Sequence, residues 1–169
     1  MDYGSSLSVL HQSFEDSQFL SFDSQKLTTF PDISLEKLRY LTIFDNQISK
    51  IPQELWKNQY LEVLNLSANQ LDFLPEQIAK LTHLRMLDIA HNQFEVLPDI
   101  FDSFEKLEFL YVGNNNLSFL PKSIGKCESL KYFNCTDAKL TTLPESFEGL
   151  VNLEEIRLYH NAIKILPDE

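Results

Sequence analysis

The sequence predicts an α/β repeat fold, in the form of a curved solenoid. A parallel, concave β-sheet of about seven strands would face short helical, 3-10 or irregular segments on the convex side. Two observations carry this prediction. A leucine recurs every 23 residues, at Leu38, Leu61, Leu84, Leu107, Leu130 and Leu153. All seven prolines share one place in this period, because they stand at Pro31, Pro52, Pro75, Pro98, Pro121, Pro144 and Pro167.

The repeats extend over residues 17–169 and follow a segment of a different kind. Seven repeats begin near residues 17, 38, 61, 84, 107, 130 and 153, and the last is incomplete. We number each repeat from its first residue, so that the leucine is position 1 and the proline is position 15. Residues 1–16 contain Leu7, Leu10 and Phe14 at helical spacing. This spacing predicts a helical N-terminal cap that shields the first repeat.

The first part of each repeat has the pattern of a short β-strand. Apolar residues at positions 4 and 6 alternate with outward positions, which predicts a strand over positions 3 to 7 with one buried face. One such unit cannot bury its apolar side alone. The units are therefore expected to stack at the strand spacing of ~4.8 Å and to share one core. Because each strand is followed by a return path, neighbouring strands should run parallel.

The part of each repeat after the proline has the pattern of a short convex helical turn. Acidic residues follow the proline at Asp32, Glu54, Glu76, Asp99 and Glu145. Negative charge at a helix N-terminus stabilises the helix by about 0.3–1 kcal/mol. We therefore interpret this column as structural rather than as an acidic binding stripe.

A column of asparagines at position 9 is interpreted as structural as well. The chain turns there, and a buried carboxamide can both donate to and accept from backbone groups that lack a strand partner. This ladder consists of Asn46, Asn69, Asn92, Asn115 and Asn161. Ala138 removes one rung, so the turn around it is expected to be looser.

Charge alternates in sign at position 2 through six repeats, in the series Arg39, Glu62, Arg85, Glu108, Lys131 and Glu154. Stacked neighbours would form opposite-charge pairs, each worth only about 0–1 kcal/mol when exposed. A slip by one repeat would place like charges together, so the series is expected to define the register. Cys127 and Cys135 fall on inward positions, which predicts two reduced, buried thiols rather than a reactive site.

The pattern L-x-x-L-x-L-x-x-N-x-L-x-x-L-P-x-x-I-x-x-L, with its 23-residue period, resembles the leucine-rich repeat family over residues 17–169. The LPxxI version is similar to the intracellular Ras-binding and Scribble-like repeats, to plant intracellular relatives and to many bacterial leucine-rich repeat proteins. The resemblance implies a solenoid whose concave face binds a partner protein, without naming that partner.

The outward strand positions 3, 5, 7 and 8 supply the candidate binding residues on the concave face. Position 3 is rich in aromatic residues and methionine, which are favoured at the energetic centres of interfaces. This stripe is open to two interpretations, as an interface or as packing between strands. Phe44, Tyr111 and Tyr159 are predicted to border a shallow groove over the small residues Ser67, Ala90 and Gly113. The full candidate set is Tyr40, Phe44, Met86, Asp88, His91, Phe109, Tyr111, Tyr132, Asn134, Arg157 and Tyr159.

Composition and charge exclude several classes of function. The formal net charge is −11, whereas binding to nucleic acid or to an anionic membrane surface requires a basic surface. No apolar run reaches the ~18 residues of a membrane span, and the N-terminus lacks the pattern of a secretory signal. We therefore expect a cytoplasmic protein without membrane insertion, and delivery to a host cell by a non-classical route stays open.

The sequence also lacks the motifs of catalysis and cofactor binding. It contains no glycine-rich phosphate loop, HExxH, CxxC or nucleophile elbow. His91 and His160 lie three repeats apart, on the order of 15 Å by strand spacing. They cannot share one zinc ion, whose bonds to histidine are ~2.0–2.1 Å. We expect no catalytic residue, no metal site and no cofactor.

These observations predict a non-enzymatic protein–protein interaction module that binds its partner through the concave face. An alternative is a scaffold or recognition segment of a larger or oligomeric assembly, for example in a bacterial host-interaction protein. Such a segment would act through an uncapped C-terminal end and could associate end to end with further copies of itself.

Overall fold

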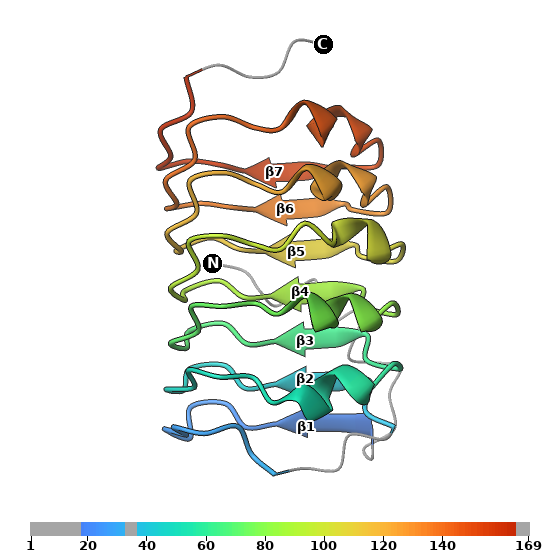
Figure 1. Cartoon of the computed structure of the whole chain (residues 1–169), viewed down its shortest axis with the longest axis vertical. Helices are drawn as coiled ribbons and strands as arrows, with labels where there is room; N and C mark the ends of the chain where they lie inside the picture. The colour runs from blue at the N-terminus through green and yellow to red at the C-terminus, as the bar shows by residue number, and fades with distance from the viewer. Residues whose placement is uncertain (1–17, 33–36, 165–169) are drawn as a thin grey trace.

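The computed structural model describes residues 18–32 and 37–164, which form one solenoid (Figure 1). The predicted N-terminal cap lies outside these residues. Neighbouring strands are parallel and hydrogen-bonded in chain order, and the same repeat positions face each other, as in the pairing of Tyr40 with Val63. The predicted parallel sheet of a leucine-stacked solenoid is thus confirmed. Its strands are β1 (Phe19–Ser21), β2 (Tyr40–Thr42), β3 (Val63–Asn65), β4 (Met86–Asp88), β5 (Phe109–Tyr111), β6 (Tyr132–Asn134) and β7 (Glu155–Arg157).

Each strand is shorter than predicted and covers positions 3 to 5 instead of positions 3 to 7. The chain still bonds to the next repeat beyond the strand, since the Phe22 N–H donates to the Thr42 carbonyl at 2.9 Å. At position 8, however, the backbone turns into the left-handed region, with φ of 53° at His91 and 59° at His160. An extended strand cannot continue through that conformation. The regular ladder ends before that turn, because the N–H at position 7 bonds to the side chain two residues back, as from Ala90 to Asp88.

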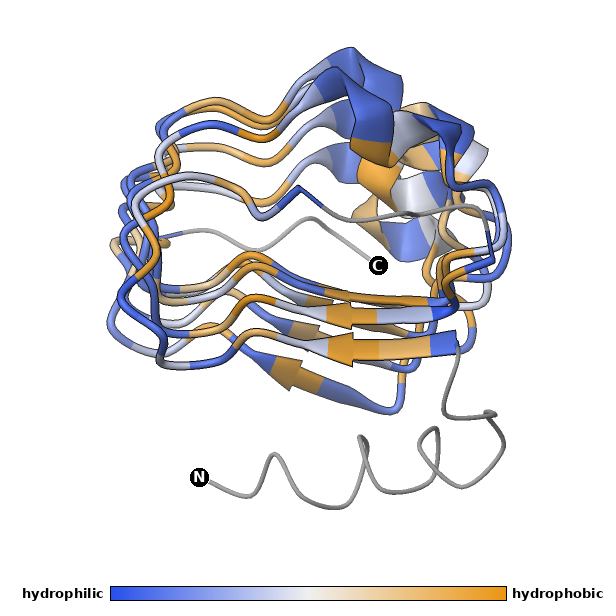
Figure 2. Cartoon of the chain, turned by 90° about the horizontal axis from the view of Figure 1, so that it is seen from below, coloured by the Kyte–Doolittle hydropathy of each residue, from blue (hydrophilic) through white to orange (hydrophobic). Residues whose placement is uncertain are grey.

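The convex side is built from short 3-10 helices that lie opposite the strands (Figure 2). Proline precedes four of them in an extended conformation, and it has no N–H to leave unpaired at that place. The predicted acidic first turn is present at Glu54, Glu76 and Glu145. Asp99 differs, because it lies before its helix and accepts the Ser123 N–H at 2.7 Å. The helices are η2 (Gln53–Lys57), η3 (Glu76–Lys80), η4 (Phe101–Ser103), η5 (Lys122–Lys126) and η6 (Glu145–Gly149).

The core lies between the sheet and the 3-10 helices and contains the predicted inward positions. Leu64 at position 4 and Leu66 at position 6 are 0% and 1% exposed. Both cysteines belong to this core and are fully buried and free, as predicted. Burial raises the pKa of Cys127 and of Cys135 to about 12. Neither thiol is therefore available as a thiolate near neutral pH.

The five asparagines at position 9 make a recurring set of hydrogen bonds to the backbone. Asn92 accepts the Leu71 N–H at 2.9 Å, and its amide nitrogen donates to the Leu66 carbonyl at 3.0 Å and to the Ile89 carbonyl at 3.2 Å. The four other asparagines make equivalent bonds to backbone groups of the repeat before their own. Each rung therefore joins the turn of one repeat to the turn of the repeat before it.

Ala138 breaks this ladder at one defined place. By the geometry of the other rungs, an asparagine there would accept the N–H of Leu117, a fully buried residue whose N–H has no hydrogen-bond partner among the described residues. Replacing Ala138 with Asn is expected to raise the free energy of unfolding by about 0.5–1.5 kcal/mol, the net value of such a bond. Urea unfolding measures this change, with the exposed neighbour Lys139→Asn as control. A loss of stability would show that the turn cannot receive the amide.

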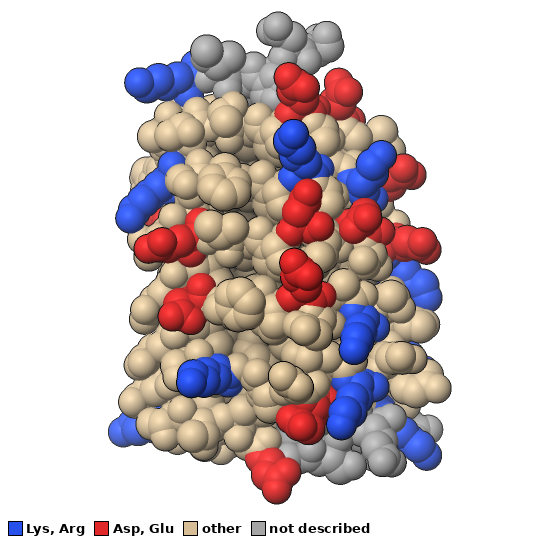
Figure 3. Space-filling view, in the orientation of Figure 1, with Lys and Arg blue, Asp and Glu red and all other residues tan. Residues whose placement is uncertain are grey.

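The alternating charges at position 2 form ion pairs from Arg39 to Lys131, whereas no ion pair to Glu154 occurs among the described residues. Arg39 pairs with Glu62, and Glu108 lies between Arg85 at 2.7 Å and Lys131 at 2.8 Å. Burial alone would raise the pKa of Glu108, but the hydrogen bonds from Lys131 and Arg85 lower it below its usual value. Figure 3 shows acidic and basic side chains interspersed along the solenoid.

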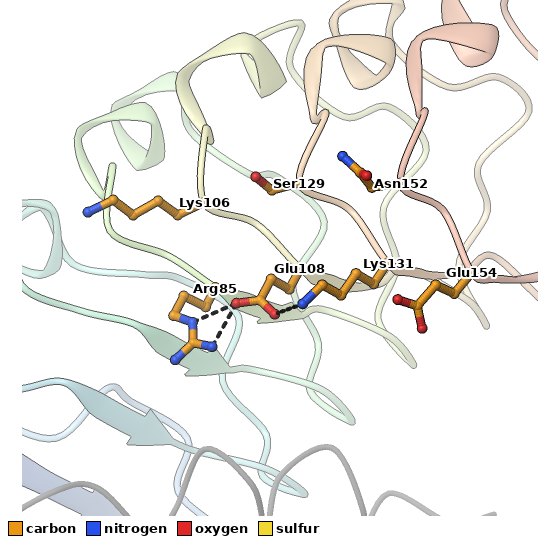
Figure 4. A pocket seen from close by; sticks show the side chains of 7 residues that line it. All are labelled: Arg85, Lys106, Glu108, Ser129, Lys131, Asn152 and Glu154. Atoms are coloured by element: carbon orange, nitrogen blue, oxygen red, sulfur yellow. Dashed lines mark hydrogen bonds and ion pairs between the residues drawn. The ribbon is translucent and has the colours of Figure 1, made fainter.

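Part of this row, from Arg85 to Glu154, lines a cavity of 420 Å³ (Figure 4). Glu108 there already pairs with both Arg85 and Lys131.

Candidate protein-binding surface

The outward positions of the sheet form a second apolar cluster, separate from the core. Tyr40, Val63, Met86 and Tyr111 are 4%, 0%, 1% and 5% exposed, and Ala90 completes the cluster. Phe19, Phe109 and Tyr132 are partly buried against it. In this structure the position-3 stripe is thus packed over β2, β3 and β4, and it is more accessible at β1 and toward β5 and β6.

Asp88 is a carboxylate within this packed region. It is 1% exposed and accepts the Ala90 N–H at 3.0 Å. Burial raises its pKa to about 7, although the hydrogen bonds from Ala90 and from the Ser67 hydroxyl oppose that change. Asn65 accepts the N–H two residues further along in the same way. At position 5, an uncharged amide oxygen can therefore accept the position-7 N–H as well as a carboxylate does.

His91 does not join Asp88 in a catalytic pair. Its side chain is exposed at the left-handed turn, while Asp88 is buried and bonded to Ala90. The two residues are neighbours in the candidate set, but within the described part of the chain no hydrogen bond or ion pair connects them.

The sheet face around β6 and β7 brings several candidate residues together. The guanidinium carbon of Arg157 lies 5.5 Å from the centre of the Tyr132 ring, in cation–π contact. The Tyr132 ring in turn lies 5.0 Å from that of Tyr111. At the turn that follows, His160 Nδ1 lies 2.8 Å from Asp137 Oδ1. The sequence did not predict that these two residues meet.

Position 7 places an exposed aromatic residue at each end of a row of small side chains. Phe44 and Tyr159 are 40% and 51% exposed. Between them, Ser67, Ala90 and Thr136 are each at most 5% exposed, and Gly113 has no room for a side chain, since an added Cβ would lie 2.7 Å from the Thr136 carbonyl oxygen. Tyr111, which we grouped with the two aromatics, stands instead at position 5 inside the packed cluster.

Sequence reasoning missed a second exposed apolar feature on another side of the solenoid. Phe73, Val96 and Phe119 occupy position 13 of three successive repeats and are 70%, 53% and 47% exposed. The signal was present in the sequence, because large apolar residues there fall outside the inward positions. It lies outside the strand positions, which supplied the predicted binding residues.

Two further properties concern the described residues as a whole. They contain no helix with the length and apolar character needed to cross a bilayer. They also contain no group of three or more His, Cys, Asp or Glu side chains placed to hold a metal ion.

The solved structures that resemble this chain include two leucine-rich repeat proteins. The leucine-rich repeat protein LIC12759 of Leptospira interrogans has a TM-score of 0.60 and 25% identity, covering 79% of this chain and 40% of that one. The leucine-rich repeat ectodomain of the Arabidopsis thaliana membrane receptor kinase GASSHO1/SCHENGEN3, in complex with CASPARIAN STRIP INTEGRITY FACTOR 2, has a TM-score of 0.68 and 33% identity. It covers 75% of this chain, which spans only 16% of that one.

The family profile described as "Leucine-rich repeat region" matches residues 20–116 and 64–165. A search of curated proteins found no match. The profile covers most of the chain, and the stacked parallel strands and asparagine ladder are those expected from the resemblance. The chain belongs to the leucine-rich repeat family, whose fold is a common protein-interaction module.

Proposed function

We propose that the chain is a non-enzymatic protein-binding module that holds its partner on the sheet face. The observation that carries this proposal is the pair of exposed aromatic side chains, Phe44 and Tyr159, at the two ends of a row of small residues. Aromatic residues are enriched among the side chains that dominate binding energy. A row of small side chains between them lets the backbone of a partner approach the sheet.

The neighbouring residues supply a rigid floor and adaptable polar contacts. The packed cluster of Tyr40, Met86 and Tyr111 is held in place before any partner arrives, which lowers the entropy cost of binding. Toward β7, Asn134 and Arg157 are partly exposed and offer hydrogen-bond donors. Phe109 and Tyr132 connect this polar end to the floor, and His91 offers a further exposed polar contact at its turn.

The plant ectodomain with a similar fold was solved in complex with another protein, CASPARIAN STRIP INTEGRITY FACTOR 2. Because this chain spans 16% of that receptor chain, the likeness supports only the class of partner, a protein or peptide. The identity of the partner has to come from experiment.

Affinity capture with the intact chain and with the double variant Phe44→Ala, Tyr159→Ala tests the proposal. Both side chains are exposed, so the fold should survive, and the captured partner is expected to lose affinity by about tenfold or more for two interface anchors. Tyr60→Ala, at a residue that is 57% exposed outside this face, is the matched control. Equal capture by the double variant and the intact chain would refute binding through this face.

A further inference from the structure

Three exposed apolar side chains form a continuous row that neither the core nor the sheet face uses. Phe73, Val96 and Phe119, which we call the lateral stripe, lie directly before the buried Leu74, Leu97 and Leu120. Since those leucines are at most 4% exposed, the chain directs position 14 inward and position 13 outward. The stripe ends at Lys50 on one side and Thr142 on the other, which hold position 13 in the flanking repeats.

This exposure is unfavourable for the isolated chain and calls for an explanation. A fully buried Phe or Val side chain gains roughly 1.5–3 kcal/mol over an exposed one, and no core contact offsets the loss here. Single exposed apolar residues are common, but a contiguous row of them marks an interaction site. Repeats stacked at ~4.8 Å place the three side chains in one row on the order of 10 Å long.

The surface is hollowed between the first two members of the stripe. A cavity of 530 Å³ lies between Phe73 and Val96, and Leu74 and Pro98 contribute further apolar walls. A hollow of this kind can receive an apolar side chain of a partner, as in other groove-binding modes.

Carboxylates border the first two members of the stripe on both sides, whereas Phe119 has Ser118 and Lys122 at the same positions. Asp72 and Glu95 precede Phe73 and Val96 at position 12, and Glu76 lines the cavity from the other side. Asp99 extends this second border at position 16, and its hydrogen bonds with Ser123 lower its pKa, so it is ionised at neutral pH. A second copy of this acidic chain would bring like charges together, whereas a basic partner would meet opposite charge.

The spacing of the stripe matches one face of an α-helix. Helical residues i, i+3 or i+4, and i+7 rise by ~5 Å and ~10 Å along the helix axis, close to the rise from one repeat to the next. We propose that the lateral stripe docks a basic amphipathic helix of another protein, lying along the solenoid. Its apolar face covers Phe73, Val96 and Phe119, and its flanking Lys or Arg side chains pair with the acidic borders. This surface shares no residue with the sheet face.

A synthetic peptide of about 18 residues, long enough for a marginal helix, tests this proposal. It carries leucines at helical spacing and lysines elsewhere, and it bears a fluorescent label. Its binding to the full chain is followed by anisotropy at ~0.15 M ionic strength, where long-range attraction is screened. A peptide with glutamate in place of lysine is the matched control. The lysine peptide is expected to bind about tenfold or more tightly than the glutamate peptide.

Three variants of the chain assign this binding to the stripe. The triple variant Phe73→Ser, Val96→Ser, Phe119→Ser is expected to weaken binding by about tenfold or more, and Asp72→Lys with Glu95→Lys by a similar factor. The control variant Tyr60→Ser, Val151→Ser alters two residues that are 57% and 72% exposed elsewhere, and it should bind like the intact chain. Circular dichroism verifies that each variant is folded.

Equal binding by the triple variant, an equal loss in the control variant, or equal affinity for the glutamate peptide would overturn the proposal. Light scattering gives an independent check, because a dimer of the intact chain that the triple variant fails to form would assign the stripe to self-association instead. The capture experiment with the Phe44, Tyr159 variant tests the sheet face alone and does not affect the peptide result. The two proposals can therefore be refuted independently.

Discussion

Replacing Asp88 with Asn is expected to raise the free energy of unfolding by about 2–4 kcal/mol at pH 8. Burial raises the pKa of Asp88 from 3.8 to about 7 in the folded chain, and each unit of difference from the unfolded chain corresponds to ~1.36 kcal/mol. At pH 8 the folded protein must therefore hold an unfavourable buried charge. Asn keeps the acceptor for the Ala90 N–H and removes that charge.

The pH dependence gives this prediction a distinctive signature. Between pH 3.8 and about 7 the folded chain keeps the Asp88 proton that the unfolded chain has released. The contribution of Asp88 to the free energy of unfolding is therefore most favourable below pH 3.8. It falls as the pH rises and stays constant above about pH 7. The gain from Asp88→Asn should accordingly be largest at pH 8 and should shrink as the pH is lowered toward 4.

Urea unfolding at several pH values measures this gain. Asp72→Asn removes an exposed carboxylate and should change stability by no more than about 0.5 kcal/mol at any of these pH values. A gain from Asp88→Asn that does not vary with pH would show that the Asp88 carboxyl is not buried as the structure has it.

Replacing Gly125 with Ala is expected to destabilise the chain by about 3 kcal/mol, the upper part of the usual range for overpacking. A Cβ on Gly125 would lie 1.8 Å from the carbonyl oxygen of Ser146 and 2.5 Å from its carbonyl carbon. These are backbone atoms of η6, so η5 and η6 would have to separate. In an open helix the same change would be favourable, because Ala has a higher helix propensity than Gly by up to ~1 kcal/mol.

Gly125→Ala is a sharp test, because overpacking would lower the free energy of unfolding whereas the helix propensity of Ala would raise it. Lys126→Ala, at the exposed neighbouring residue of η5, is the control, and it should change stability by at most about 0.5 kcal/mol. Thermal and urea unfolding of both variants measure the difference. A stabilised Gly125→Ala chain would mean that the two 3-10 helices are further apart than the structure places them.

The repeat made the fold predictable from the sequence to an unusual degree. The 23-residue period, the column of prolines and the apolar residues at positions 4 and 6 were enough to predict the parallel sheet. Each repeat must bury the same face in the same way as its neighbours. The asparagine ladder was predictable for the same reason, and so was the charge series. Strand length was overestimated, because the side chain at position 5 takes the N–H of position 7 away from the ladder, as Asp88 does for Ala90.

The candidate surface was less predictable than the fold. Inward and outward directions follow from the repeat, so the aromatic residues of the sheet face could be chosen from the sequence. Whether an outward side chain is accessible depends on what packs beside it, and Met86 and Tyr111 turn out to be buried while Phe44 and Tyr159 are exposed. The lateral stripe is the opposite case, because the repeat places its apolar residues outside the inward positions, and the structure adds how far each one is exposed.

The sequence by itself determined the family, the order and direction of the strands, the core positions and the role of the asparagines. All of these depend on periodicity, which the order of residues along the chain records directly. Only the tertiary structure decided that Asp88 is a buried, protonatable acid, that Gly125 sits against the backbone of the next helix, and that Phe73, Val96 and Phe119 form one exposed row. The physical reason is that these three properties come from contacts between neighbouring repeats, whose equivalent residues are about 23 positions apart in the sequence. The pattern within one repeat does not give the distances between such residues.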